Sequence, residues 1–352
     1  MSDPYSPLKV FWHRSHVDAI REGRVVAPVH VQLIPTNVCN QSCEFCAYRS
    51  HGYSSSQQFD TRDSIPFPKL AEIVADCEDM GVRAVEVTGG GEPTCHKNFP
   101  QVCMMVVDGG MDLGVVTNGT RWAQDCVTAT QHAKWVRFSL DAGSAETYAA
   151  TRRSTKEAYT NVRAAIRQQR ESRVEKDQLV GVGFVMTRNN FQEVVEATER
   201  ARDDGADTIR ISAVFQDEGI RYFYDFRDHA ERLVQEARSL DDGQFRVFDM
   251  FSHRLKDLEE ARPNYHRCDF QKLCTYVGAD LNLYRCCVVS YNEAGRLISL
   301  ADRPLQEAWF DPAVQKKLLE FDPAACPRCM FNAKNRAIAF AAEKDPQHVN
   351  FL

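Results

Sequence analysis

Short apolar runs alternate with longer amphipathic stretches from Val31 to about Ser212. This alternation is typical of parallel strands joined by crossover helices, because a strand buried on both faces is apolar throughout and a covering helix carries one apolar stripe. The pattern predicts six strand–helix units. We expect strands at 31–34, 84–88, 113–117, 135–140, 181–186 and 208–212, and helices that begin at Pro66, Phe99, Arg121, Ser144 and Asn190.

Six such units can close into a partial barrel or open into a doubly wound sheet, and periodicity does not choose between the two. In either architecture the functional site is expected at the carboxyl ends of the strands. After Gln216 the alternation stops. The strongly charged segment 226–262 has helical spacing and is predicted to be a helical bridge.

From residue 263 onward the chain becomes rich in cysteine and carries short strand candidates at 275–277 and 281–284. This change in composition predicts a second module. We therefore expect a division into an N-terminal arm (1–30), a core (31–225), the helical bridge (226–262) and a C-terminal module with its tail (263–352).

Composition limits the classes of function. The 352 residues are 43% hydrophobic, enough for a sizeable core. Lys and Arg total 43 against 49 Asp and Glu, so the formal charge of -6 gives no support for a nucleic-acid partner. The N-terminus has no apolar export signal, and nowhere do 18 apolar residues run together, so a soluble cytoplasmic protein without a membrane partner is expected.

Thirteen cysteines are unusual for such a chain. An odd number without an export signal argues against a disulfide scaffold and favours metal or cluster ligation for the closely spaced ones. Cys77, Cys95, Cys103 and Cys126 have no partner at ligand spacing and are interpreted as buried thiols.

Three cysteines directly follow the first expected strand, at a C-x3-C-x2-C spacing. Thiolates at this spacing suit zinc or an iron–sulfur cluster, and a cluster held by three cysteines leaves one iron open to an external ligand. A zinc knuckle needs a nearby fourth ligand, and the next candidate is His51. The three residues are Cys39, Cys43 and Cys46.

With Phe45 before the third cysteine, this motif resembles the signature of the radical S-adenosylmethionine (radical SAM) superfamily. The resemblance implies an α/β fold, a partial (β/α)6 TIM-like barrel with a small C-terminal α+β module. It also implies a 4Fe-4S cluster whose open iron is chelated by S-adenosylmethionine, with Phe45 near the adenine. The sequence TGGGEPT after the second strand is similar to the family's GGE motif, which implies that Gly90, Gly91 and Glu92 meet the methionyl part of the cofactor.

The fourth expected strand ends in RFSLDAG. Side chains alternate along a strand, so Ser139 and Asp141 should point to the same face, toward the site. By resemblance both contact the cofactor. Asp141 has a second interpretation, as the N-cap of the helix that begins at Ser144.

Two weaker candidates complete the expected cofactor pocket. Arg152 and Arg153 are expected in the fourth helix, where relatives often carry an arginine that binds the cofactor carboxylate, and Arg153 is the candidate; solvated surface is the alternative. Asn118, in TNGT after the third strand, either binds the ligand or forms an ordinary Asn-Gly turn.

Six further cysteines lie between residues 268 and 329. A C-x17-C-x39-C-x2-C pattern among them resembles the twitch domain, a shortened relative of the SPASM domain, which implies one auxiliary 4Fe-4S cluster. Cys274 could replace the first ligand and Cys287 the second. The usual Asp-Gly turn of the hairpin in this module is replaced by residues 279–282, which leaves its geometry open. The expected ligands are Cys268, Cys286, Cys326 and Cys329.

The resemblance implies an oxidoreductase or a related radical enzyme. It would cleave S-adenosylmethionine reductively to a 5'-deoxyadenosyl radical, which abstracts hydrogen from an unactivated carbon. The expected reaction is a two-electron oxidation of a small polar molecule or nucleotide, with flavodoxin or ferredoxin as reductant. Alternatives are peptide modification or crosslinking, a redox-neutral rearrangement, or a zinc-stabilised binding protein of another class. No catalytic base is identified.

Overall fold

The computed structural model describes residues 3–50, 57–260, 262–263, 265–344, 347 and 350. Over this part of the chain, ten strands form one sheet in the order β10-β9-β8-β1-β2-β3-β4-β5-β6-β7. The strands are β1 (His30–Leu33), β2 (Ala84–Val87), β3 (Asp112–Thr117), β4 (Trp135–Ser139), β5 (Leu179–Met186), β6 (Thr208–Ala213), β7 (Arg246–Asp249), β8 (Cys274–Val277), β9 (Asn282–Tyr284) and β10 (Arg296–Ser299).

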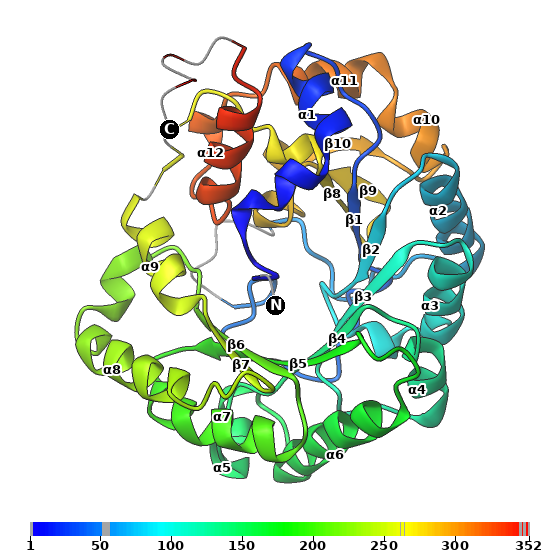
Figure 1. Cartoon of the computed structure of the whole chain (residues 1–352). Helices are drawn as coiled ribbons and strands as arrows, with labels where there is room; N and C mark the ends of the chain where they lie inside the picture. Colours follow the sequence, from blue (N-terminus) through cyan, green and yellow to red (C-terminus); the bar gives the residue numbers. More distant parts are fainter. Residues whose placement is uncertain are drawn as a thin grey trace.

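The sheet is mostly parallel and open. Strands β1 to β7 pair in parallel with their sequence neighbours, β8 pairs in parallel with β1, and only β9 and β10 are antiparallel. Because β7 and β10 stand at the two edges, the sheet curls without closing (Figure 1). This confirms the expected partial barrel, and all six strands predicted from the apolar runs are present.

Helices cover the outer side of the curved sheet (Figure 1). The expected helix starts agree with the structure to within a few residues, except that the helix from Ser144 divides into α5 and α6. The helices are α1 (Arg14–Arg21), α2 (Phe67–Asp79), α3 (Phe99–Asp108), α4 (Gln124–Thr130), α5 (Ala145–Thr151), α6 (Lys156–Ser172), α7 (Val194–Asp203), α8 (Arg227–Arg238), α9 (Phe251–Glu260), α10 (Leu305–Trp309), α11 (Pro312–Leu319) and α12 (Asn332–Ala341).

Burial alternates along the strands. In β1 and β2 every second residue is buried and those between are partly exposed. The buried residues, such as Val31, Leu33 and Val85, belong to the main core. Because side chains alternate across a sheet, the partly exposed residues lie on the opposite, inner face. The core therefore lies between sheet and helices, while the inner face stays accessible.

The predicted helical bridge is wrong in one respect, because it contains a strand. Between α8 and α9, residues Arg246–Asp249 form β7, which pairs in parallel with β6. This strand has only four residues. Because a charged residue stands at each end, its two apolar residues, Val247 and Phe248, do not form a recognisable apolar run in the sequence. The parallel alternation thus continues for a seventh unit beyond Gln216.

The cysteine-rich C-terminal segment does not form a sheet of its own. Its strands β8, β9 and β10 extend the core sheet beyond β1. The two strand candidates of this segment are confirmed as the hairpin of β8 and β9. Leu281 has a φ of 59°, so it takes the left-handed conformation that an Asp-Gly turn assigns to glycine.

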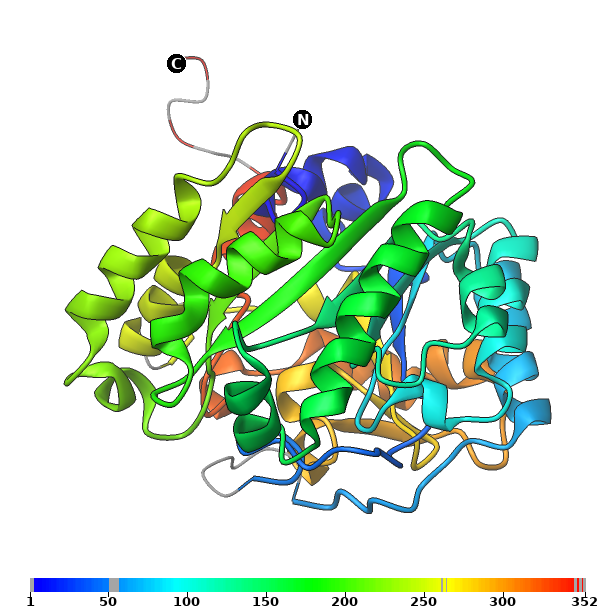
Figure 2. The same cartoon turned by 90° about the horizontal axis from the view of Figure 1, so that it is seen from below.

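The N-terminal arm packs against the C-terminal helix and the inner face of the sheet. The short helix η1 (Pro7–Trp12) lies against α12. Tyr5 stacks edge-on against Phe248 of β7, with ring centroids 5.2 Å apart. Figure 2 shows this arm at one end of the strands and the loop after β1 at the other. None of the described helices is long and apolar enough to cross a membrane.

Candidate functional site

The three cysteines of the first motif lie in one loop at the carboxyl end of β1. Tight turns shape this loop: the amide of Cys46 donates to the carbonyl of Cys43 at 3.2 Å, and Ser50 donates to that of Cys46 at 2.9 Å. All three side chains, Cys39 included, are free thiols of intermediate burial. The next candidate ligand in sequence, His51, lies outside the described residues.

The thiols of this loop influence one another electrostatically. Burial raises the pKa of Cys39 to about 12, and the neighbouring charges of Glu92 and Cys43 add to this effect. Burial also raises the pKa of Cys43, and Cys46 contributes. Metal ligation requires thiolates, so binding at this loop must release protons.

Arg49 and α5 hold the cysteine loop in place. The guanidinium of Arg49 donates to the carbonyls of Gln41 at 3.2 Å and Asn37 at 3.0 Å. The amide of Glu44 donates to the carbonyl of Thr151, the last residue of α5, at 2.9 Å. These bonds satisfy polar backbone groups of a loop that has no regular structure.

The glycine-rich turn after β2 packs directly on the backbone that leads into the cysteine loop. The amide of Gly91 donates to the carbonyl of Thr36 at 3.1 Å, and that of Glu92 to the carbonyl of Val38 at 2.9 Å. A Cβ at Gly91 would lie 2.2 Å from the carbonyl oxygen of Val38. At Gly90 it would lie 2.2 Å from the side-chain oxygen of Asn37. Only glycine permits this contact.

We expect Gly91→Ala to displace the cysteine loop and to lower both stability and iron content. The added methyl group meets backbone atoms that cannot rotate away, so the cost is about 1–3 kcal/mol. Chemical denaturation and iron analysis of the reconstituted protein measure the two effects. The control for iron content is Gly23→Ala, where a Cβ meets nothing within 4 Å; the φ of +76° strains an alanine there, so this variant also loses some stability. Equal iron loss in both variants would contradict this role of Gly91.

Glu92 lies at the centre of a hydrogen-bond network beneath the turn. Its side chain is 3% exposed and accepts from the hydroxyl of Thr117 at 2.7 Å, the amide of Asn118 at 2.7 Å and the amide of Thr94 at 3.1 Å. Burial raises the pKa of Glu92, and these hydrogen bonds oppose the rise. The carboxylate therefore ties the ends of β2 and β3 together.

Ser139 and Asp141 occupy different environments. Ser139 ends β4 and keeps partial exposure on the inner face. Asp141 lies beyond the strand with a φ of 56°, so alternation no longer governs its direction. Its carboxylate accepts from the amide of Val185 at 2.6 Å and pairs with Arg152. Asp141 is not a helix cap, because the N-cap of α5 is Ser144.

Arg152 links this carboxylate to the cysteine loop. Its guanidinium donates to the side-chain oxygen of Gln41 at 2.9 Å and contacts the sulfur of Cys43 at 3.7 Å. It also lies 5.8 Å above the ring of Phe45. Burial lowers the pKa of Arg152, but the charges of Asp141 and Cys43 outweigh it and the pKa is raised. Sequence reasoning missed this contact, because a pair of adjacent arginines does not reveal which one is buried.

Arg153 and Asn118 are the remaining candidates. Arg153 is exposed, lies in the turn after α5 instead of in the helix, and has a φ of 47°. Asn118 forms the expected turn, in which the φ of Gly119 is +70°. Its side-chain amide donates to the side-chain oxygen of Asn40 in the cysteine loop at 2.8 Å. Cofactor contacts of Phe45, Gly90, Gly91, Glu92, Asn118, Ser139, Asp141 and Arg153 stay predictions.

Removing either member of the buried pair of Arg152 and Asp141 should strongly destabilise the protein. Arg152→Met and Asp141→Asn each leave an uncompensated buried group, at a cost of about 3–5 kcal/mol. The double variant should lose much less stability than the two single variants lose together, because both charges are then removed. Urea denaturation of the four proteins measures this coupling. Strict additivity would show that the two side chains act independently.

The four expected ligands of the second cysteine group line one small cavity of about 20 Å³. The cavity lies beneath the start of α12, and its other walls include Phe270, Phe321 and Phe331. No three His, Cys, Asp or Glu side chains of the described residues are close enough together to hold a single metal ion. Neither these four cysteines nor the three of the first loop therefore form a single-ion cage in this arrangement. The four that line the cavity are Cys268, Cys286, Cys326 and Cys329.

Hydrogen-bond donors point at the sulfurs around this cavity. The hydroxyl of Tyr265 donates to Cys329 at 3.0 Å, and the amide of Phe331 reaches the same sulfur at 3.2 Å. The amide of Val288 donates to Cys286 at 3.3 Å. Burial raises the pKa of Cys329 to about 11. These donors suit sulfurs that carry negative charge, as cluster ligands do.

The alternative ligands do not line the cavity, although the side chain of Cys287 hydrogen-bonds with that of Cys286. Cys274 begins β8, and its sulfur is 3.4 Å from Nδ1 of His30. Cys287 packs against a cluster of buried tyrosines that includes Tyr276 and Tyr291. Cys77, Cys103 and Cys126 are buried as expected, and Cys95 is partly exposed.

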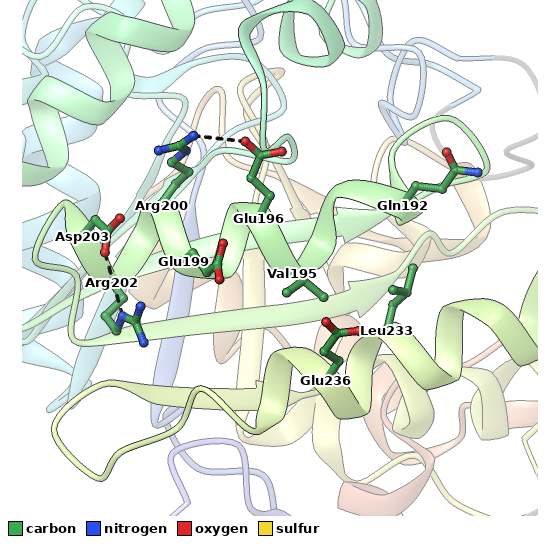
Figure 3. A pocket seen from close by; sticks show the side chains of 9 residues that line it. All are labelled: Gln192, Val195, Glu196, Glu199, Arg200, Arg202, Asp203, Leu233 and Glu236. Atoms are coloured by element: carbon green, nitrogen blue, oxygen red, sulfur yellow. Dashed lines mark hydrogen bonds and ion pairs between the residues drawn. The ribbon is translucent and has the colours of Figure 1, made fainter.

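A second pocket lies between α7 and α8, away from every cysteine. Figure 3 shows its charged lining, in which Arg200 pairs with Glu196 at 3.2 Å and Arg202 lies 3.9 Å from Asp203. Neighbouring side chains thus satisfy these charges, and the lining contains none of the candidate residues. We assign no role to this pocket.

Parts of the chain are similar in sequence to a protein family and to individual proteins of known name. Residues 33–185, from the end of β1 to β5, match the sequence model of the Radical SAM superfamily. The chain is similar to a probable GTP 3',8-cyclase of Metallosphaera sedula, with 25% identity over 62% of this chain and 66% of that protein. The GTP 3',8-cyclase of Xanthomonas axonopodis pv. citri is 28% identical over 35% of this chain and 36% of its own. The matches span less than two thirds of these relatives.

Solved structures share the fold. Streptococcus suis SuiB bound to S-adenosylmethionine superimposes with a TM-score of 0.65 and 14% identity, covering 91% of this chain and 74% of SuiB. The structure of anSMEcpe with bound AdoMet gives a TM-score of 0.60 and 14% identity, covering 90% of this chain and 97% of that one. At such low identity the likeness concerns the fold alone.

Proposed function

Residues 33–185 match the sequence model of the Radical SAM superfamily, and from that premise we propose an enzyme that reductively cleaves S-adenosylmethionine. The observation that carries the proposal is the loop of Cys39, Cys43 and Cys46 at the carboxyl end of β1. Three free cysteines within one loop, at a C-x3-C-x2-C spacing, suit a 4Fe-4S cluster with one open iron. When bound, the cluster supplies the electron for cleavage, and the cofactor supplies the radical that takes hydrogen from a substrate.

The chain's own residues would bind and orient the cofactor. The backbone of Gly90 and Gly91 can approach it closely because no Cβ intervenes. Ser139, on the accessible inner face, offers a hydroxyl at the end of β4. Arg152 holds Phe45 and Cys43 in position from beneath. Glu92, with Asn118, fixes the neighbouring strand ends so that these groups keep their geometry.

We further propose an auxiliary 4Fe-4S cluster in the cavity of Cys268, Cys286, Cys326 and Cys329. The shared cavity and the donors to its sulfurs support this assignment. With four cysteine ligands no iron is left open, so electron transfer suits this cluster better than binding substrate. The proposed reaction is accordingly a two-electron oxidation of a small polar molecule or nucleotide.

A second candidate is a redox-neutral rearrangement of a nucleotide. The similarity to proteins named GTP 3',8-cyclase favours it, because a cyclisation can join two atoms within one molecule. The product of a rearrangement has the same mass as its substrate. Mass spectrometry of anaerobic reactions with candidate nucleotides therefore separates the two, since oxidation removes two hydrogens.

The proposed cleavage is tested with anaerobically purified, reconstituted protein. With dithionite and S-adenosylmethionine it should form 5'-deoxyadenosine, and the protein should be brown and contain iron and sulfide. A colourless protein with stoichiometric zinc and no 5'-deoxyadenosine would support the zinc-stabilised binding protein instead.

A further inference from the structure

The inner face of the sheet is lined by polar residues that remain partly exposed. Along β4, Arg137 and Ser139 keep partial exposure, while Val136 and Phe138 between them are completely buried. In β6 the corresponding inner residue is Arg210. These polar side chains lie on the inner face of the curved sheet, below the strand ends that carry the proposed cofactor site.

Two arginines meet on this inner face. Arg137 lies opposite Gly181 of β5 in the strand register, and Arg210 lies opposite Gly183, two residues further along the same strand. The side chain of Arg137 extends over Gly183, because a Cβ built there would be 3.7 Å from its Cδ. Because Gly181 and Gly183 have no side chains, the Arg137 side chain can lie across β5, directed toward Arg210.

Neither guanidinium has a hydrogen bond or an ion pair to any described residue. Arg137 lies 5.2 Å above the ring of Trp135, and Arg210 lies 5.4 Å above the ring of Tyr5. The Nε atom of Arg210 is buried without an acceptor. By contrast, the buried Arg254 nearby pairs with Asp257 at 3.0 Å.

The interior carries an excess of positive charge. Burial, together with the charges of Arg137 and Arg254, lowers the pKa of Arg210 to about 10, while Glu86 acts in the opposite direction. Glu86 is itself engaged by His30 at 3.6 Å and by Gln32 at 3.4 Å. Guanidinium groups without a carboxylate partner of their own are costly in a partly desolvated space.

We propose that Arg137 and Arg210 form a subsite for an oxyanion of the substrate, either a carboxylate or a phosphate. The planar guanidinium fork matches both groups and would exchange its missing hydrogen bonds for charge-assisted ones. Arg137 lies two residues below Ser139, roughly 7 Å along the strand. A substrate anchored there by its anionic end would extend its reacting carbon toward the cofactor site. This proposal rests on the proposed function and names its substrate class.

The test is calorimetric titration of the reconstituted protein with inorganic phosphate and, separately, with malonate, in Tris chloride buffer. At least one anion should bind. Arg137→Gln and Arg210→Gln should each weaken that binding by about tenfold or more, since a charge-assisted contact is lost. Arg210→Lys should retain part of the affinity because it keeps the charge. Arg62→Gln is the control, because this side chain is 87% exposed and should not change the binding.

The outcomes are distinct. Binding of phosphate alone indicates a phosphorylated substrate, binding of malonate alone a carboxylic acid, and binding of both a subsite for any compact oxyanion. If neither anion binds, if both Gln variants bind as the wild type does, or if Arg62→Gln loses as much affinity, the subsite is refuted. If one Gln variant fails to fold, the other decides. The titration needs no turnover, so failure of cofactor cleavage would contradict the proposed function separately.

Discussion

Replacing Cys39, Cys43 and Cys46 together with alanine should abolish 5'-deoxyadenosine formation, by roughly a thousandfold or more. No cluster with an open iron can form without these thiolates, so the sulfonium is no longer activated. Iron content should fall by about half, because the auxiliary cluster is held by other cysteines. Liquid chromatography of 5'-deoxyadenosine and iron analysis measure the two effects.

The matched control is Cys103→Ala, which removes a buried thiol of α3 that is not an expected ligand. It should retain both iron and cleavage. Continued cleavage by the triple variant would show that these cysteines are not the active ligands. Complete loss of iron, or no loss, would contradict the assignment of two clusters.

Cys326→Ala combined with Cys329→Ala should remove the auxiliary cluster and leave the first one intact. Iron should again fall by about half, while 5'-deoxyadenosine still forms. With a deuterated substrate, label should still reach 5'-deoxyadenosine, but oxidised product should fall to background, because the electron of the substrate radical has no acceptor. Mass spectrometry of both products measures this separation.

Cys287→Ala and Cys274→Ala are the controls for the auxiliary site, because neither side chain lines its cavity. Both should keep their full iron content. If Cys287→Ala loses as much iron as Cys286→Ala, the adjacent cysteine is the ligand. If the Cys326→Ala, Cys329→Ala variant formed as much oxidised product as the wild type, an electron-transfer role for the auxiliary cluster would be contradicted.

Much of the fold could be predicted because its strands are strongly apolar. The six runs between 31 and 212 are buried against helices on one side, so tertiary burial and sequence pattern agree. β7 could not be predicted from the sequence, because Arg246 and Asp249 flank only two apolar residues. The sequence also could not indicate that β8 pairs with β1, since strands separated by more than 200 residues share no local signal.

The candidate site likewise has features that the sequence predicts and contacts that it does not. Close cysteine spacing and glycines that permit backbone contact are local features, and the sequence contains them. The pairing of Asp141 with Arg152 depends on the left-handed turn at Asp141 and on where α5 ends. Such contacts between loops follow from the assembled fold. The same holds for Arg137 and Arg210, which lie on different strands and meet only across the bare surface of β5.

The central claim is that the first cysteine loop holds a cluster with an iron open to S-adenosylmethionine. Electron paramagnetic resonance of the dithionite-reduced protein, with and without S-adenosylmethionine, tests it most directly. We expect the cofactor to shift the signal of one cluster in the wild type and in the Cys326→Ala, Cys329→Ala variant, and to leave the triple variant unchanged. A reduced wild-type signal that does not respond to the cofactor, or an equal response in the triple variant, would contradict the claim.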